Sequence, residues 1–138
     1  MPLKTTIEKA HKDAREGKSP STQAGEFVHE EIDRIRKGEH GARSAKQAIA
    51  IGLSKARRAG VKLPPPSKST TSAGTRRKAQ RDSAVGAGQR TRSTSPTRSR
   101  ATARALKREG SNAASRQALS KQAKQSATTR RRAGRKSA

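Results

Sequence analysis

The sequence predicts a mostly α-helical fold class with extensive disorder, in which a small helical hairpin is followed by a long disordered basic tail. Large apolar residues at helical spacing are confined to the first half of the chain. Residues 67–138 carry twenty Lys and Arg against two acidic residues, and only three large apolar side chains. Burying such a side chain returns about 1.5–3 kcal/mol, whereas ordering one residue costs about 1.5 kcal/mol. The tail is therefore not expected to fold alone.

Residues 1–20 are expected to form a polar N-terminal arm that contains a short helix over residues 6–16. Thr5 and Glu8 have the spacing of a capping box, and Gly17 stands where a glycine commonly ends a helix. The predicted helix has a single large apolar residue, so the arm offers little apolar surface of its own.

Residues 21–63 are expected to form the hairpin. Its first helix is predicted from apolar residues that recur at helical spacing up to Gly38. These residues are Ala24, Phe27, Val28, Ile32 and Ile35. Glu31 falls inside this apolar stripe, and a carboxylate in such a place indicates a pairing partner or an edge position.

The second helix of the hairpin is predicted over residues 45–59. Ser44 and Gln47 form a capping box, and Gly60 follows the last periodic residue. The short, glycine-containing connection between the two helices predicts that they pack antiparallel. Residues 64–66 are all proline, which predicts a semi-rigid spacer before the tail.

Two strings in the hairpin, FVHEEI at 27–32 and SAKQAIAIGLSKARRAG at 44–60, carry a family resemblance. The chain resembles an uncharacterised family of small basic bacterial proteins over residues 25–63. The resemblance implies DNA binding of a histone-like kind and supplies no catalytic residue. The tail resembles the C-terminal arms of linker histones in composition only.

The tail has the composition of a polycation that binds phosphates. Fourteen of its twenty basic residues are Arg, which favours bidentate phosphate contacts. Phe27 is the only aromatic residue of the sequence, so recognition of single-stranded bases by stacking is not expected, and duplex DNA or structured RNA is the better target. The candidate nucleic-acid-binding residues are Arg76, Arg77, Lys78, Arg81, Arg90, Arg92, Arg98, Arg100, Arg104, Lys107, Arg108, Arg116, Lys121, Lys124, Arg130, Arg131, Arg132, Arg135 and Lys136.

These features predict a histone-like, nucleoid-associated protein that binds DNA without sequence specificity by neutralising phosphates. An RNA- or ribosome-associated basic protein fits the same charge. A further alternative is a protein-interaction module in which the hairpin binds the partner and the basic tail is an electrostatic tether. In either case the hairpin could bind a second copy of the chain or another protein. The chain has no apolar run long enough to span a bilayer and no secretory signal, so a cytoplasmic location without a membrane partner is expected.

Neither an enzyme nor a cofactor is expected. The sequence shows no pattern that predicts a catalytic nucleophile with a base and oxyanion donors. It also has no cysteine, so thiolate chemistry is excluded. His29 and Asp33 are four residues apart, a spacing that could supply two of the ligands of a metal ion. Two further ligands are not found nearby in the sequence, so no metal is expected either. The Ser95–Arg98 segment has the pattern of a turn in minor-groove-binding histone tails, and phosphorylation there would weaken phosphate binding.

Overall fold

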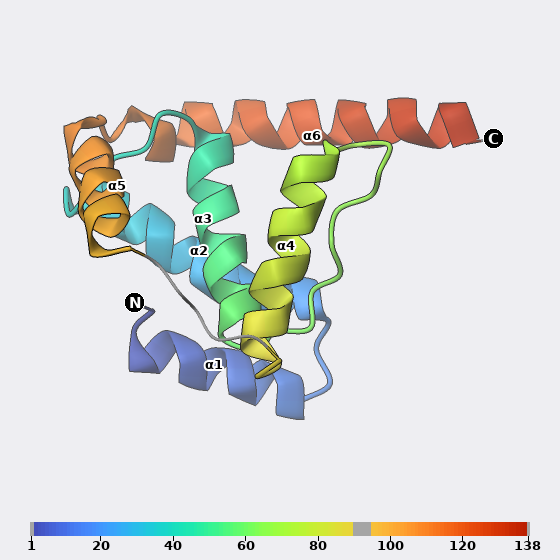
Figure 1. The fold of residues 1–138 in the computed structure, drawn as a ribbon. Helices are drawn as coiled ribbons and strands as arrows, with labels where there is room; N and C mark the ends of the chain where they lie inside the picture. Colours follow the sequence, from blue (N-terminus) through green and yellow to red (C-terminus); the bar gives the residue numbers. More distant parts are fainter. Residues whose placement is uncertain (1, 90–94, 138) are drawn as a thin grey trace.

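Six α-helices and one 3-10 turn form the part of the chain that the computed structural model describes, residues 2–89 and 95–137 (Figure 1). Helices α2 and α3 pack on each other at the centre, α1 packs on α2, and α4 packs on α3. The bounds are α1 Lys4–Arg15, α2 Pro20–Arg36, α3 Ala45–Arg58, α4 Ala73–Gly86, α5 Pro96–Arg108, η1 Asn112–Ala114 and α6 Arg116–Ser137.

The predicted fold class, a helical hairpin followed by a disordered tail over residues 67–138, is wrong. In the described part of that tail, α4, α5, η1 and α6 are helical. The expectation counted large apolar side chains and assumed that the tail must fold by itself. Instead Ala79, Ala113 and Ala114 are buried, and the last two share a cluster with residues of the first half. Small side chains thus let the backbone of the tail pack directly on the rest of the chain.

Serine caps define where the helices of the tail begin. Ser72, Ser95 and Ser115 each accept a hydrogen bond from the backbone N–H three residues later. Such a cap satisfies one of the free donors at a helix start and contributes about 0.5–2 kcal/mol. The same device starts α2 at Ser19 and α3 at Ser44, and the cap at Ser44 was predicted.

The start of α1 differs from the prediction, whereas its end agrees with it. The helix begins at Lys4 after Leu3, without a side-chain cap, so the expected capping box of Thr5 is not formed. Gly17 has a φ of 76°, the left-handed conformation that glycine adopts most readily after a helix.

Helices α2 and α3 run antiparallel along a seam of small residues. Ile35 near the end of α2 shares a cluster with Ala48 near the start of α3, and Ala24 shares one with Ala56 at the opposite end. Between these pairs, Gly52 lies against Val28, where an added Cβ would stand 2.7 Å from the Val28 Cα. The two backbones can approach this closely only because residue 52 is glycine.

The apolar core consists of two clusters at the two ends of this seam. The first contains Phe27 and Val61, with half-buried Ile7 and Leu53 packed against it. The second is built on Ile35, and its other buried members are all alanines. Because these alanines include Ala113 and Ala114 from the tail, the second cluster joins the two halves of the chain.

A polar contact and a close backbone approach hold α4 on α3. Asp82 accepts a hydrogen bond of 2.7 Å from the Ser54 hydroxyl. Gly86 lies against the carbonyl oxygen of Arg57, where a Cβ would collide with that oxygen. The guanidinium of buried Arg57 donates to the carbonyl of Pro64 at 2.9 Å. Burial lowers the pKa of Arg57, and the charge of Asp82 opposes that shift.

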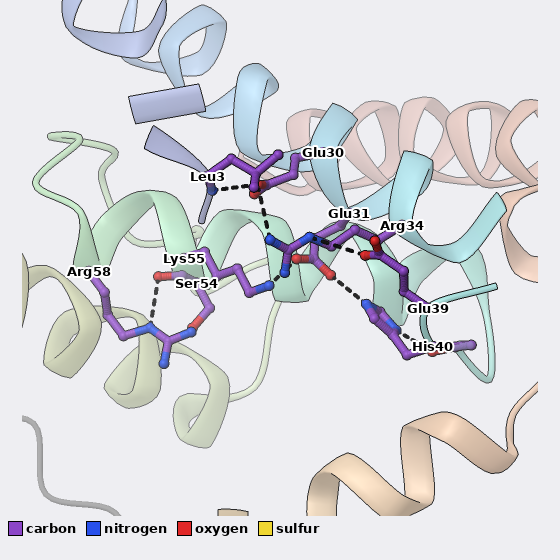
Figure 2. A network of polar contacts seen from close by, with 10 residues as sticks. Leu3, Glu30, Glu31, Arg34, Glu39, His40, Ser54, Lys55 and Arg58 are labelled. Carbon is purple, nitrogen blue, oxygen red and sulfur yellow. Dashed lines mark hydrogen bonds and ion pairs between the residues drawn. The ribbon is translucent and has the colours of Figure 1, made fainter. Parts of the chain in front are cut away.

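The carboxylate of Glu31 is fully buried at the centre of the seam, where Figure 2 shows its partners. The Lys55 ammonium of α3 contacts its Oε1. The ring Nε2 of His40 lies 3.0 Å from its Oε2. Of the two alternatives predicted for Glu31, a pairing partner or an edge position, the structure shows the first, and both carboxylate oxygens have a partner.

Removing the charge of Glu31 should destabilise the fold. The substitution Glu31→Gln keeps the shape of the side chain but leaves Lys55 and His40 facing a neutral amide. Breaking a buried ion pair costs about 3–5 kcal/mol, and we expect the lower end because both partners are partly exposed. Chemical denaturation monitored by circular dichroism measures the change.

Glu39→Gln is the matched control for this substitution. Glu39 pairs with Arg34 at 3.6 Å, but its side chain is 57 % exposed, and exposed pairs contribute about 0–1 kcal/mol. Equal stability losses in the two variants would contradict a special role for Glu31.

Candidate nucleic-acid interface

Helix α6 presents one basic face to solvent. Successive residues of an α-helix are about 100° apart, which places five exposed cations within an arc of about 100°. We call this set the α6 stripe; its members are Lys121, Lys124, Arg131, Arg132 and Arg135. The half-buried Leu119, Gln122 and Ser126 lie on the opposite side of the helix. The stripe therefore points away from the body of the protein.

The start of α6 is fixed to the body. Ala113 and Ala114 are buried beside Ile35 in the second cluster, and the Arg36 side chain donates to the carbonyl of Ala114 at 3.0 Å. Ser115 then caps the helix through the N–H of Ala118 at 3.1 Å. In Figure 1 the C-terminal part of α6 extends past α4 and past the other helices.

Helix α5 is held at its C-terminal end by the loop between α2 and α3. The N–H of Gly41 donates to the carbonyl of Leu106 at 2.8 Å, and the N–H of Ala42 donates to that of Gly110 at 3.2 Å. A Cβ at residue 41 would collide with the carbonyl of Glu109. No residue of α5 is buried, so its cations Arg98, Arg100, Arg104, Lys107 and Arg108 are all exposed.

The loop that holds α5 is itself held by the buried carboxylate. His40 places one ring nitrogen against Glu31 and the other 2.9 Å from the carbonyl oxygen of Gly41. A continuous path of contacts thus leads from Lys55 in α3 through Glu31 and His40 to the backbone that positions α5.

Helix α4 contributes a smaller basic face. Arg77, Lys78 and Arg81 are exposed on the side away from buried Ala79. Arg76 is half-buried and donates to the carbonyl of Pro66 at 2.8 Å, so part of its bonding capacity is used within the fold.

The structure brings together some of the predicted binding residues and separates others. Arg116 and Arg130 fall outside the α6 stripe, although both are exposed. Arg90 and Arg92 lie outside the described residues, as does the side chain of Lys136. The predicted residues therefore form basic faces on three helices instead of one continuous flexible polycation.

Arg36 is a candidate that sequence reasoning missed. It comes from α2, yet it lines a shallow depression of ≈ 290 Å³ together with Arg116, Ser111, Ala114 and Ser115 at the start of α6. No sequence signal distinguishes Arg36 from the other charged residues of α2, because its position depends on the docking of the tail.

The acidic residues of the first half are largely matched by cations of the same half. Asp13 accepts from the Lys18 ammonium at 2.9 Å, a hydrogen bond that raises the pKa of Lys18. Arg34 lies 3.3 Å from Glu30, and Lys55 contacts Glu31. By contrast, within residues 95–137 as described, no cation of α5 or α6 forms an ion pair.

Metal ligands do not gather in the part of the chain that the structure describes. His29 and Asp33 lie 3.6 Å apart on α2, and no group of three His, Asp or Glu side chains is found among the described residues. None of the described helices is long and apolar enough to cross a membrane.

The comparisons with known proteins give one match. The model of a family of unknown function (DUF6496) matches residues 4–68, which include α1, α2 and α3. The chain is thus similar to an uncharacterised family over its first half, and the basic faces of α4, α5 and α6 lie beyond the matched region. No curated protein and no solved structure matches the chain.

The close approach at Gly41 gives a test of how the tail docks. Gly41→Ala should push the loop away from Glu109, because a backbone carbonyl cannot yield as a flexible side chain would. We expect a loss of about 1–3 kcal/mol in unfolding free energy, the usual range for overpacking. Tryptic cleavage at Lys107 and Arg108 should also become faster.

Gly25→Ala is the control for this test, since an added Cβ at Gly25 meets nothing within 4 Å. It should leave the cleavage rate unchanged and should not lower stability. A Gly41→Ala protein with the stability and cleavage rate of the wild type would contradict the docking of residues 106–110 on this loop.

Proposed function

We propose that the protein binds nucleic acid, and duplex DNA in particular, without sequence specificity, as a histone-like, nucleoid-associated protein of the cytoplasm. Phosphates are neutralised by the exposed cations of α4, α5 and α6. The observation that supports this most strongly is that the cations of α5 and α6 are solvent-exposed and, among the described residues, have no carboxylate partner. Such cations release counterions from a polyanion without first breaking an ion pair within the protein.

The apolar and aromatic content of the chain favours phosphate contact over base recognition. Phe27 is the only aromatic residue of the sequence and is 1 % exposed in the first cluster. Base stacking, the usual means of holding single strands, is therefore not available to it. Structured RNA carries the same phosphate charge as DNA and is the alternative partner. The experiment must therefore distinguish binding to RNA from binding to DNA.

The salt dependence of binding tests the proposal. If about 6–10 phosphates are contacted, the logarithm of the association constant should fall with the logarithm of the salt concentration at a slope of about −5 to −9. Fluorescence anisotropy with duplexes of about 30 base pairs, roughly three helical turns, measures this slope. Two duplexes of unrelated sequence should bind equally. A slope near zero, or tighter binding to a folded RNA of equal length, would refute the proposal for DNA.

Charge-matched variants localise the binding. Replacing Arg100, Arg104 and Lys107 of α5 with Gln should make the slope shallower by up to about 3 units. Replacing Lys4, Lys9 and Arg15 of α1 removes the same charge far from α6 in Figure 1 and should leave the slope nearly unchanged. Equal effects of the two variants would mean that net charge alone governs binding.

A further inference from the structure

We propose that the α6 stripe enters the major groove of duplex DNA. This inference rests on the proposed function and goes further, because it names the element that enters the duplex and the groove that receives it. The argument uses the shape of α6, the order of charges along it and the side chain at the centre of the stripe.

The shape of α6 suits the groove. An α-helix with its side chains is about 10–12 Å across, and the major groove of B-DNA is about 12 Å wide. The 22 residues of α6 span about 33 Å. Of the other described elements, α6 contacts only α3 and η1. Because its C-terminal part extends past the rest of the fold (Figure 1), a duplex can reach the stripe without meeting the body.

The cations of the stripe form two rows. At about 100° per residue, Lys121 and Arg132 lie along one edge, whereas Lys124, Arg131 and Arg135 lie along the other. A major groove has phosphates along both of its walls, so a helix inside it needs cations on both flanks. One row alone would be enough for a helix that lies across a single backbone strand.

Thr128 stands between the two rows and faces the expected floor of the groove. Its hydroxyl donates to the carbonyl of Lys124 at 3.0 Å, within α6 itself. The hydroxyl hydrogen is therefore already used, so Thr128 itself donates no hydrogen bond to a base edge. Binding that does not depend on sequence then follows if the stripe cations contact phosphates.

Other polyanionic surfaces fit the stripe less well. The major groove of duplex RNA is deep and too narrow to admit a helix. Insertion into a lipid surface needs large apolar side chains beside the cations, and Leu119, the only one in α6, is half-buried on the opposite side.

The test compares two DNA duplexes that differ only in the major groove. One is unmodified, and the other carries a glucosylated hydroxymethyl group at C5 of each cytosine, which fills the major groove and leaves the phosphate charge unchanged. Wild-type protein should bind the glucosylated duplex at least about tenfold more weakly, and duplex RNA of the same length should resemble the glucosylated DNA.

Two variants of equal charge complete the test. The stripe variant replaces all five stripe residues with Gln, a good helix former, and circular dichroism verifies that α6 is retained. The control variant carries Gln at five other cations: Arg77, Lys78, Arg81, Arg98 and Arg104. The stripe variant should lose about 4–5 units of salt slope and bind both duplexes equally, whereas the control should still distinguish them.

The outcomes separate this inference from the proposed function. Equal wild-type binding to both duplexes, with a steep salt slope, would overturn groove entry and leave nucleic-acid binding intact. Loss of discrimination in the control variant but not in the stripe variant would also overturn it. Absence of binding to every duplex would refute the proposed function itself.

Discussion

The buried carboxylate of Glu31 is the constraint on which the rest of the structure depends. A charge taken out of water must be matched, and here the match comes from Lys55 in α3 and His40 in the following loop. Satisfying it fixes how α2 meets α3 and where the loop lies. That loop carries the backbone donors that hold the end of α5. A polar requirement inside the first half thus positions the loop that holds the C-terminal end of α5.

The first half was predictable because its signals are local. Apolar residues of α2 recur at helical spacing, and Ser44 caps α3 as its sequence spacing indicates. The sequence also indicated that Glu31 has either a pairing partner or an edge position. The identity of the partners was not predictable, because His40 and Lys55 are nine and 24 residues away and become neighbours only when α2 and α3 pack. Sequence spacing carries little information about such contacts.

The second half was mispredicted because its core is made of alanines and close backbone approaches. Ala113 and Ala114 bury little area individually, and their burial depends on Ile35, which is far away in the sequence. The residue types of the candidate interface were predicted, since clusters of Arg and Lys are apparent in the sequence whatever the fold. The grouping of these cations on the faces of particular helices was not predicted. Lys121 and Arg132 share an edge only because one helix, α6, continues through both positions, whereas the sequence predicted a disordered tail there.

A core of alanines also governs how the unfolded chain behaves. Aggregation of unfolded proteins starts at uncharged segments rich in large apolar and β-branched residues. This chain has one clear segment of that kind, Ala-Ile-Ala-Ile-Gly-Leu at 48–53, and Lys46 and Lys55 stand on either side of it as charged gatekeepers. Elsewhere most of the buried apolar residues are alanines, and the net charge of +24 opposes association of separate chains. We therefore expect the unfolded chain to have a low tendency to aggregate.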